Sequence, residues 1–152
     1  MTQPVSIKNR KARFNYEILD RYTAGIQLRG TEIKALREGK ASIAESFCEF
    51  KNNELFVINM NIEEYSHATH FNHMPKSERK LLLNRNELKA IQKAVEATGL
   101  TIIPLHCFTN AKGYAKLEIA VARGKKNYDK RAAMQERDSK RDLARIKKSF
   151  NR

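Results

Sequence analysis

Three histidines recur at three-residue spacing, and this pattern invites a chemical interpretation. They are His67, His70 and His73, in the run His-Ala-Thr-His-Phe-Asn-His. On a helix, this spacing would place neighbouring imidazoles on one face, where a metal-dependent nuclease could hold its ion. Asn72 and Pro75 oppose a helix of that length, and no Cys or Asp gathers nearby. We therefore expect no metal site, and predict a loop in which His73 hydrogen-bonds backbone or contacts RNA.

The carboxylates do not indicate an enzyme. Glu63 and Glu64 are adjacent in a polar segment, and no nucleophile or acid–base pair is marked by their spacing. Glycine-rich loops of the kind that cradle nucleotide phosphates are absent from the sequence. We expect no catalytic residue and no cofactor.

Basic residues interleaved with aromatic ones form three blocks. The blocks are residues 8–13, followed by Phe14 and Tyr16; residues 76–85; and residues 123–131. Cations can neutralise phosphates while rings stack on unpaired bases, so the pattern favours RNA. One such block could be a solvated face, but three together are less easily explained that way. In the first block, we interpret Arg10, Lys11 and Arg13 as RNA-binding residues.

The net charge supports a polyanionic partner. The 152 residues carry 30 Lys or Arg against 17 Asp or Glu, a formal charge of +13. No apolar run is long enough for a membrane helix, and the N-terminus lacks a secretory signal, so we expect no membrane association. Two cysteines, Cys48 and Cys107, are too few for a disulfide scaffold. We interpret both as reduced, largely buried thiols of a cytoplasmic protein.

The charge divides the chain into two parts, residues 1–123 and residues 124–152. The second part holds 11 basic and 4 acidic residues but few apolar ones. Such a segment buries too little surface to offset its ordering entropy, so we expect it to be disordered alone. Against a phosphate-lined surface that neutralises it, a helix is expected. A merely solubilising basic tail is the alternative.

The first half of the body predicts strands and a short helix. Residues 15–28 alternate as a strand, in which Gly25 suits a bulge or a sharp bend. Residues 31–38 predict a helix with Thr31 as N-cap and Gly39 as its stop. Residues 46–51 and 54–58 flank Asn52-Asn53, which predicts a β-hairpin. Residues 61–78 read as irregular.

The second half predicts a helix and a further strand pair. The helix runs from residue 84 or 85 to about residue 98, with Asn84 or Asn86 as its cap. Strands are predicted over residues 100–109 and 114–121, with core candidates Ile102, Leu105, Phe108, Leu117, Ile119 and Val121. The predicted fold class is mainly β with α. It is a small antiparallel β-barrel of the oligonucleotide-binding type, with two or three flanking helices and a basic C-terminal tail.

The order of several motifs resembles the SmpB family, the SsrA-binding proteins that partner transfer-messenger RNA (tmRNA) in bacterial trans-translation. The resemblance covers residues 9–145. It is carried by Asn9-Arg10-Lys11-Ala12-Arg13, Ala24-Gly25-Ile26, Gly30-Thr31-Glu32-Ile33-Lys34-Ala35-Leu36-Arg37-Glu38-Gly39-Lys40-Ala41, Phe71-Asn72-His73, Arg79-Lys80-Leu81-Leu82-Leu83, Gly124-Lys125-Lys126 and Asp129-Lys130-Arg131.

The resemblance implies an RNA-binding barrel whose partners are tmRNA and the ribosome, through its small-subunit RNA. Such a protein holds the tRNA-like end of tmRNA and delivers it to stalled ribosomes, while its tail probes the empty mRNA channel at the decoding centre. Rescue of the ribosome and tagging of the nascent chain would follow. No DNA partner is expected, and we expect a monomer.

Site residues follow from the positions that match the family's motifs. Leu82 and Asn84 align with RNA-contact positions, as does Lys116 on a late strand. Thr23 stands at an RNA-contact position where family members commonly have Glu. The decoding-centre tail aligns with Gly124, Lys125, Lys126, Tyr128, Asp129, Lys130 and Arg131. A ribosomal protein or translation factor that binds ribosomal RNA is the alternative function.

Overall fold

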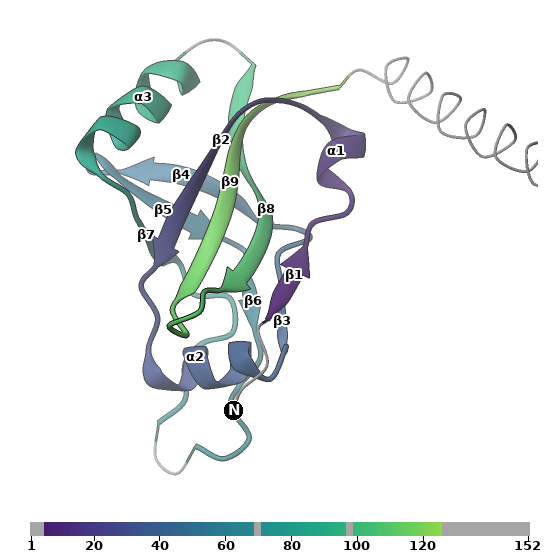
Figure 1. The fold of residues 1–152 in the computed structure, drawn as a ribbon, viewed down its shortest axis with the longest axis vertical. Coiled ribbons are helices and arrows are strands. Elements are labelled where there is room, and N and C mark those ends of the chain that lie inside the picture. The colour runs from purple at the N-terminus through teal and green to yellow at the C-terminus, as the bar shows by residue number, and fades with distance from the viewer. Residues whose placement is uncertain (1–4, 69–70, 97–98, 126–152) are drawn as a thin grey trace, which may run out of the picture.

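The computed structural model describes residues 5–68, 71–96 and 99–125, together forming a curled antiparallel sheet with helices around it (Figure 1). In chain order, the elements are β1 (Ser6–Lys8), α1 (Ala12–Asn15), β2 (Tyr16–Ile26), α2 (Gly30–Arg37), β3 (Ala41–Ser42), β4 (Phe47–Lys51), β5 (Glu54–Ile58), β6 (Asn61–Ile62), β7 (Arg79–Leu82), α3 (Arg85–Val95), β8 (Leu100–Thr109) and β9 (Ala115–Gly124).

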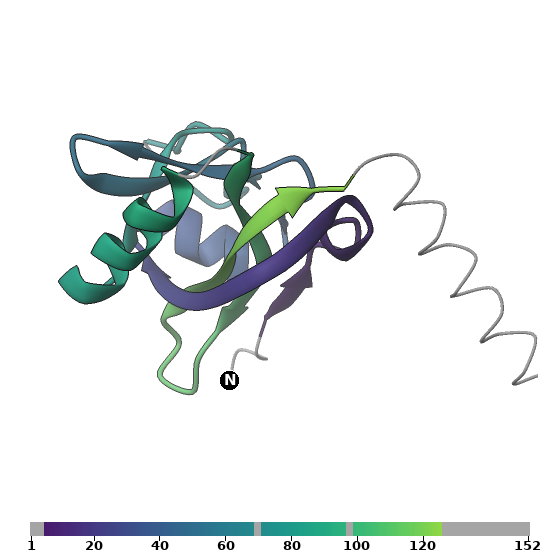
Figure 2. The same cartoon turned by 90° about the horizontal axis from the view of Figure 1, so that it is seen from above.

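The main sheet closes on itself. Its strand order is β1-β8-β4-β5-β7-β2-β9, and an additional β8–β9 pairing closes the strands from β8 to β9 into a ring, with β1 added along β8. Closing the ring pairs the edges that β8 and β9 would otherwise expose, which is how small barrels limit edge-to-edge association. Helix α2 lies at one end of the ring and α3 lies against its side (Figures 1 and 2). The predicted fold class, a small mainly-β barrel with flanking helices, is confirmed for the described residues.

The interior of the ring is apolar. Its fully buried side chains include Leu55, Val57, Leu81, Leu117, Ile119 and Val121. Cys48 and Cys107 lie among them as free, buried thiols, as predicted. Burial raises the pKa of both thiols, that of Cys107 to about 12, because an apolar interior disfavours the thiolate.

Local turn and capping signals are confirmed. Asn52 and Asn53 adopt positive φ angles of 51° and 65° between β4 and β5. Gly39 ends α2 with φ of 76°. Asn84 caps α3, accepting the Glu87 backbone N–H at 2.8 Å, while the Glu87 carboxylate accepts the Asn84 N–H at 3.3 Å. This reciprocal arrangement satisfies two backbone donors that a helix start leaves open.

Two local predictions are wrong. Thr31 is not the cap of α2: the helix begins earlier, with Arg29 as N-cap, whose N–H donates to the Glu32 carboxylate at 2.9 Å. The acid at the third helical position therefore lies at Glu32. Gly25 is not a bulge, because β2 keeps its register with β9 there, and the register shifts between Ile18 and Asp20 instead.

A bulge in β8 overturns part of the predicted core. The β8–β9 register shifts between Pro104 and His106, so the extra residue Leu105 reverses which side chains face inward. Ile102 and Cys107 join the ring interior, whereas Leu105 packs in a second apolar cluster with Ala12. Phe108 is half-buried on the outer face of the sheet rather than in the core.

Some elements were not predicted. Basic residues obscure the apolar pattern of three of them, the strands β1 and β7 and the short helix α1. A fourth, β6, lies in the segment that was expected to be irregular. Strand β9 extends to Gly124, beyond its predicted end. Within the described ranges, no helix has the length and apolar character that crossing a membrane requires.

Candidate RNA interface

Two of the predicted contact positions, Leu82 and Lys116, lie on one face of the sheet on either side of Gly25. Gly25 of β2 pairs with Leu82 of β7 on one side and with Lys116 of β9 on the other. A Cβ atom placed on Gly25 would lie 3.4 Å from Leu82 Cβ and 3.8 Å from Lys116 Nζ. Leu82, although apolar, is 51% exposed. The bare glycine backbone thus separates an exposed apolar side chain from an ammonium group, and we call this set the Leu82–Gly25–Lys116 row.

Thr23 extends the same face. It lies two residues before Gly25 in β2, so its exposed side chain points to the same side of the sheet. Its partner across the ladder is Glu118 of β9, whose carboxylate lies 3.6 Å from the guanidinium of Arg21. The hydroxyl of Thr23 is therefore next to an ion pair rather than in an apolar setting.

Asn84 follows Leu82 by two residues and is exposed at the start of α3. Its Oδ1 atom accepts the capping hydrogen bond from Glu87. The amide group thus holds the helix start through its oxygen, which leaves its NH₂ as the group that can donate to a ligand. Asn84 therefore stabilises the start of α3 whether or not it also binds a ligand.

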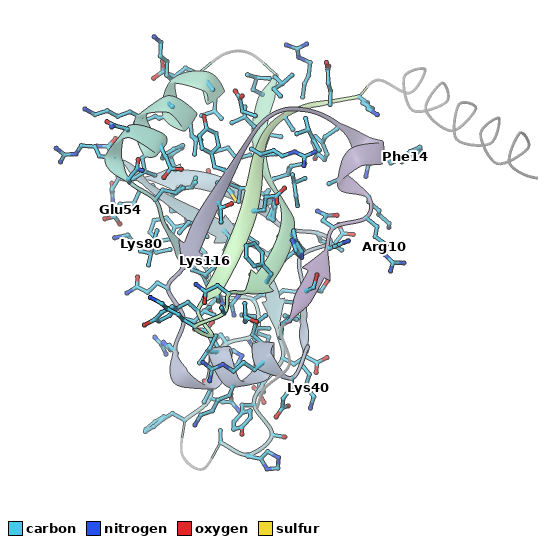
Figure 3. The ribbon with its side chains drawn as sticks, viewed as in Figure 1. Arg10, Phe14, Lys40, Glu54, Lys80 and Lys116 are labelled. Carbon is cyan, nitrogen blue, oxygen red and sulfur yellow. The ribbon has the colours of Figure 1, made fainter. Side chains whose placement is uncertain are left out.

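The first basic block is divided between two hollows. Arg10, which projects beside β1 in Figure 3, lines a hollow of about 360 Å³ together with Lys8, Arg21 and His106. Lys11 instead lines a second hollow, of about 280 Å³, between α1 and the start of β4. Arg13 lies in α1, and the structure does not describe its side chain. Arg10 joins the sheet face, whereas Lys11 does not line the same hollow.

The tail begins at the end of β9. Gly124 pairs with Tyr16, and the Lys125 N–H donates to the Asn15 carbonyl at 2.9 Å. The predicted tail residues Lys126, Tyr128, Asp129, Lys130 and Arg131 lie outside the described residues.

The histidine pattern resolves into a structural role for His73. Its Nδ1 lies 2.9 Å from Thr31 Oγ1 and its Nε2 lies 2.9 Å from the Ile62 carbonyl, in a buried position. The predicted hydrogen bond to backbone is confirmed. His67 is exposed and His70 falls outside the described residues. Across the described part of the chain, no three His, Cys, Asp or Glu side chains gather in metal-binding geometry.

One residue of the second basic block is not available to a ligand. The Arg79 side chain is buried against Glu32, and its guanidinium also donates to the carbonyls of Met60 at 2.6 Å and Pro75 at 3.0 Å. Lys80, the next residue, is partly exposed, and its Nζ lies 3.0 Å from Glu54 Oε1 on β5. Figure 3 labels both residues on the same side of the ring. The contacts of Arg79, not those of Lys80, tie α2 and the segment before β7 to the strand that carries Leu82.

The sequence model of the family described as "SmpB protein" matches residues 6–149. The chain belongs to the SmpB family. The SsrA-binding protein of Christiangramia forsetii is 66% identical over 150 residues, covering 99% of this chain and 96% of its own. That of Flavobacterium johnsoniae is 62% identical over 151 residues, covering 99% of this chain and 100% of its own.

A solved SmpB-family chain shares the fold. It is described as "tmRNA-SmpB: a journey to the center of the bacterial ribosome". The TM-score is 0.67 at 45% sequence identity, and the match covers 80% of this chain and 85% of the solved one. The SmpB resemblance indicated by the motifs is thereby confirmed at the level of both sequence and fold.

Two rings of this candidate interface, His106 and Phe108, were not predicted as RNA contacts. Lys8, His106 and Phe108 share the outer face of the sheet with the Leu82–Gly25–Lys116 row. The alternation Leu-His-Cys-Phe in residues 105–108 carried a signal, since it places two rings on the side opposite Cys107. Only the bulge at Leu105 decides which side is the interior, and that bulge is not visible in the sequence pattern.

Proposed function

We propose that this protein binds the tRNA-like part of tmRNA and delivers it to stalled ribosomes for trans-translation, which rescues the ribosome and tags the nascent chain. The observation that carries the proposal is the match of nearly the whole chain to SsrA-binding proteins. A solved relative described with tmRNA and the bacterial ribosome supports it further. The role is non-enzymatic, requires one copy of the chain, and places the protein in the cytoplasm.

The Leu82–Gly25–Lys116 row supplies the RNA contacts in this proposal. Leu82 packs on an extruded base and Lys116 holds a phosphate, while the Asn84 amide and the Thr23 hydroxyl donate hydrogen bonds. Gly25 lets the RNA backbone approach the sheet between the two side chains, because no Cβ occupies that space. Arg10 and Arg13 add neutralising charge at the N-terminal side, with Lys11 on the neighbouring surface.

The tail supplies the ribosome contacts. It leaves the barrel where β9 ends beside Asn15 and carries a net charge of +7 over residues 124–152. We propose that residues 124–131 contact the decoding centre, and that the rest forms a helix in the empty mRNA channel, where ribosomal RNA neutralises it.

The RNA that copurifies with the protein separates this proposal from its alternative. We expect tmRNA to be enriched when the tagged full-length protein is isolated from cells with translation stalled. A ribosomal protein or translation factor would recover ribosomal RNA instead. Ribosomal RNA without tmRNA enrichment would contradict the proposal.

Lys116 tests the role of the sheet face. Lys116→Ala should weaken binding to a tmRNA transcript and reduce the slope of log K against log salt by about one, because one phosphate contact is lost. The matched control is Lys40→Ala, which removes the same charge beside α2, where Lys40 lies 3.3 Å from Glu38 (Figure 3). An unchanged slope for Lys116→Ala would show that Lys116 contacts no phosphate.

The tail is tested by truncation after Lys125, which keeps the Lys125–Asn15 hydrogen bond intact. The truncated protein should bind tmRNA nearly as well as the full chain and fail to support tagging on stalled ribosomes. Equal loss of both activities would argue against a separate role for the tail.

A further inference from the structure

Two rings of β8 lie beside the Leu82–Gly25–Lys116 row. Phe108 is the ladder partner of Lys116, and His106 is the ladder partner of Glu118. Directly opposed residues of an antiparallel pair project from the same face, so both rings share the outer face with Lys116. The row therefore continues across β9 onto β8.

The two rings stack on each other and form a preorganised aromatic pair. The centroids of His106 and Phe108 lie 5.0 Å apart with planes 27° from parallel, and both side chains are half-buried. The hydroxyl of Ser6 lies 2.7 Å from His106 Nε2, which fixes the imidazole from the neighbouring strand β1. We call this pair the His106–Phe108 platform. Little side-chain entropy is left to lose when a ligand stacks on it.

Cations surround the platform. Lys8 is the ladder partner of His106 on the β1 side, and its side chain is exposed. Lys8, Arg10 and Arg21 line the hollow of about 360 Å³ that also borders His106. Glu118, in the same hollow, forms the ion pair with Arg21. A planar base can extend such an aromatic stack while the neighbouring cations hold its phosphate.

We propose that the His106–Phe108 platform is a stacking subsite for an unpaired nucleobase of the bound RNA, whose adjoining phosphate is held by Lys8 and Arg10. The inference rests on the proposed function, because it requires RNA on this face of the sheet. It adds a base-stacking contact on β8 and β1 to the contacts assigned to β2, β7 and β9. A single-stranded segment of RNA that runs from Leu82 to Lys8 would pass over the platform.

The test separates stacking from charge. Phe108→Leu keeps apolar packing and removes the ring, so affinity for a tmRNA transcript should fall about tenfold with an unchanged salt slope. Phe108→Tyr restores the ring and should restore the affinity. Lys8→Ala should instead lower the salt slope by about one. The matched control is Phe71→Leu, which removes an exposed ring in the segment between β6 and β7.

Wild-type protein gives a readout that does not depend on how well a variant folds. Ultraviolet irradiation of the complex with tmRNA, followed by mass spectrometry, should find a nucleotide crosslinked to the peptide containing His106 and Phe108. Wild-type affinity in Phe108→Leu, or no such crosslink, would overturn the inference. If Lys116→Ala still weakened binding, the proposed function would stand. Equal binding of tmRNA and an unrelated RNA would overturn both.

Discussion

Replacing Glu32 with Gln should destabilise the fold strongly, because it removes one charge of a buried pair. The Glu32 and Arg79 side chains are 5% and 2% exposed. One carboxylate oxygen accepts from Arg79 Nε, and the other accepts the Arg29 N–H that starts α2. Glutamine keeps the shape and one acceptor oxygen. In either orientation its amide nitrogen would face a donor, the Arg79 guanidinium or the Arg29 N–H, so one hydrogen bond would be replaced by two opposed donors.

The size of the loss follows from what still surrounds Arg79. Removing one partner of a buried ion pair costs about 3–5 kcal/mol, since the remaining charge stays out of water. The carbonyls of Met60 and Pro75 continue to accept from the guanidinium, which places Glu32→Gln near the lower value. With a urea m-value of about 2 kcal/mol/M, a loss of about 3 kcal/mol lowers the unfolding midpoint by about 1.5 M.

Equilibrium urea unfolding followed by circular dichroism measures this effect. The matched control is Glu54→Gln, whose partner Lys80 lies 3.0 Å away with both side chains exposed to solvent. An exposed pair contributes about 0–1 kcal/mol, so the control should unfold close to the wild type. Equal midpoints for the two variants would refute the reasoning that burial of the Glu32–Arg79 pair holds α2 and β7 together.

Four further outcomes are expected. Asn84→Ala should lose about 1 kcal/mol of unfolding free energy, whereas Asn84→Asp, which keeps the capping oxygen, should unfold in urea like the wild type. Gly25→Val should weaken tmRNA binding in a titration while leaving the urea midpoint nearly unchanged, because its side chain occupies the gap between the two functional side chains of the row. The buried thiols of Cys48 and Cys107 should react with a thiol reagent only as the protein unfolds. Because burial raises the pKa of Cys107 to about 12, its contribution to stability is full below pH ~8.5 and lost as the pH rises toward 12, which urea unfolding across that range measures.

Sequence signals of short range predicted the parts of the fold that depend on neighbours in the chain. The Asn52-Asn53 turn fixes the β4–β5 hairpin by its own backbone preference, and Asn84 with Glu87 specifies the start of α3. These features needed no knowledge of distant residues.

Features set by distant residues could not be predicted in the same way. Arg79 looked like part of a basic surface, yet its partner Glu32 is 47 residues away. Strand β1 is short and polar, and it forms only because β8, about 100 residues later, offers an edge. The bulge at Leu105 reversed the facing of Phe108 and so moved a predicted core ring onto the candidate interface.

The candidate site, too, was predictable only where its residues belong to local sequence motifs. The family motifs supplied Thr23, Leu82, Asn84 and Lys116, and the ladder pairings show Leu82 and Lys116 flanking Gly25. The rings of His106 and Phe108 belong to none of the family motifs named above. Their alternation with Cys107 was visible in the sequence, but their position on the outer face depends on a register shift rather than on residue type.

Equilibrium binding of the full-length protein to the tRNA-like part of tmRNA tests the central claim most directly. The comparison is with a fragment of ribosomal RNA of equal length, each titrated into wild-type protein and into a variant carrying both Leu82→Ala and Lys116→Ala. We expect wild-type protein to prefer the tmRNA fragment, and we expect the double variant, shown by circular dichroism to be folded, to lose this preference. Equal affinity of wild-type protein for both RNAs, or an undiminished preference in the double variant, would contradict the central claim.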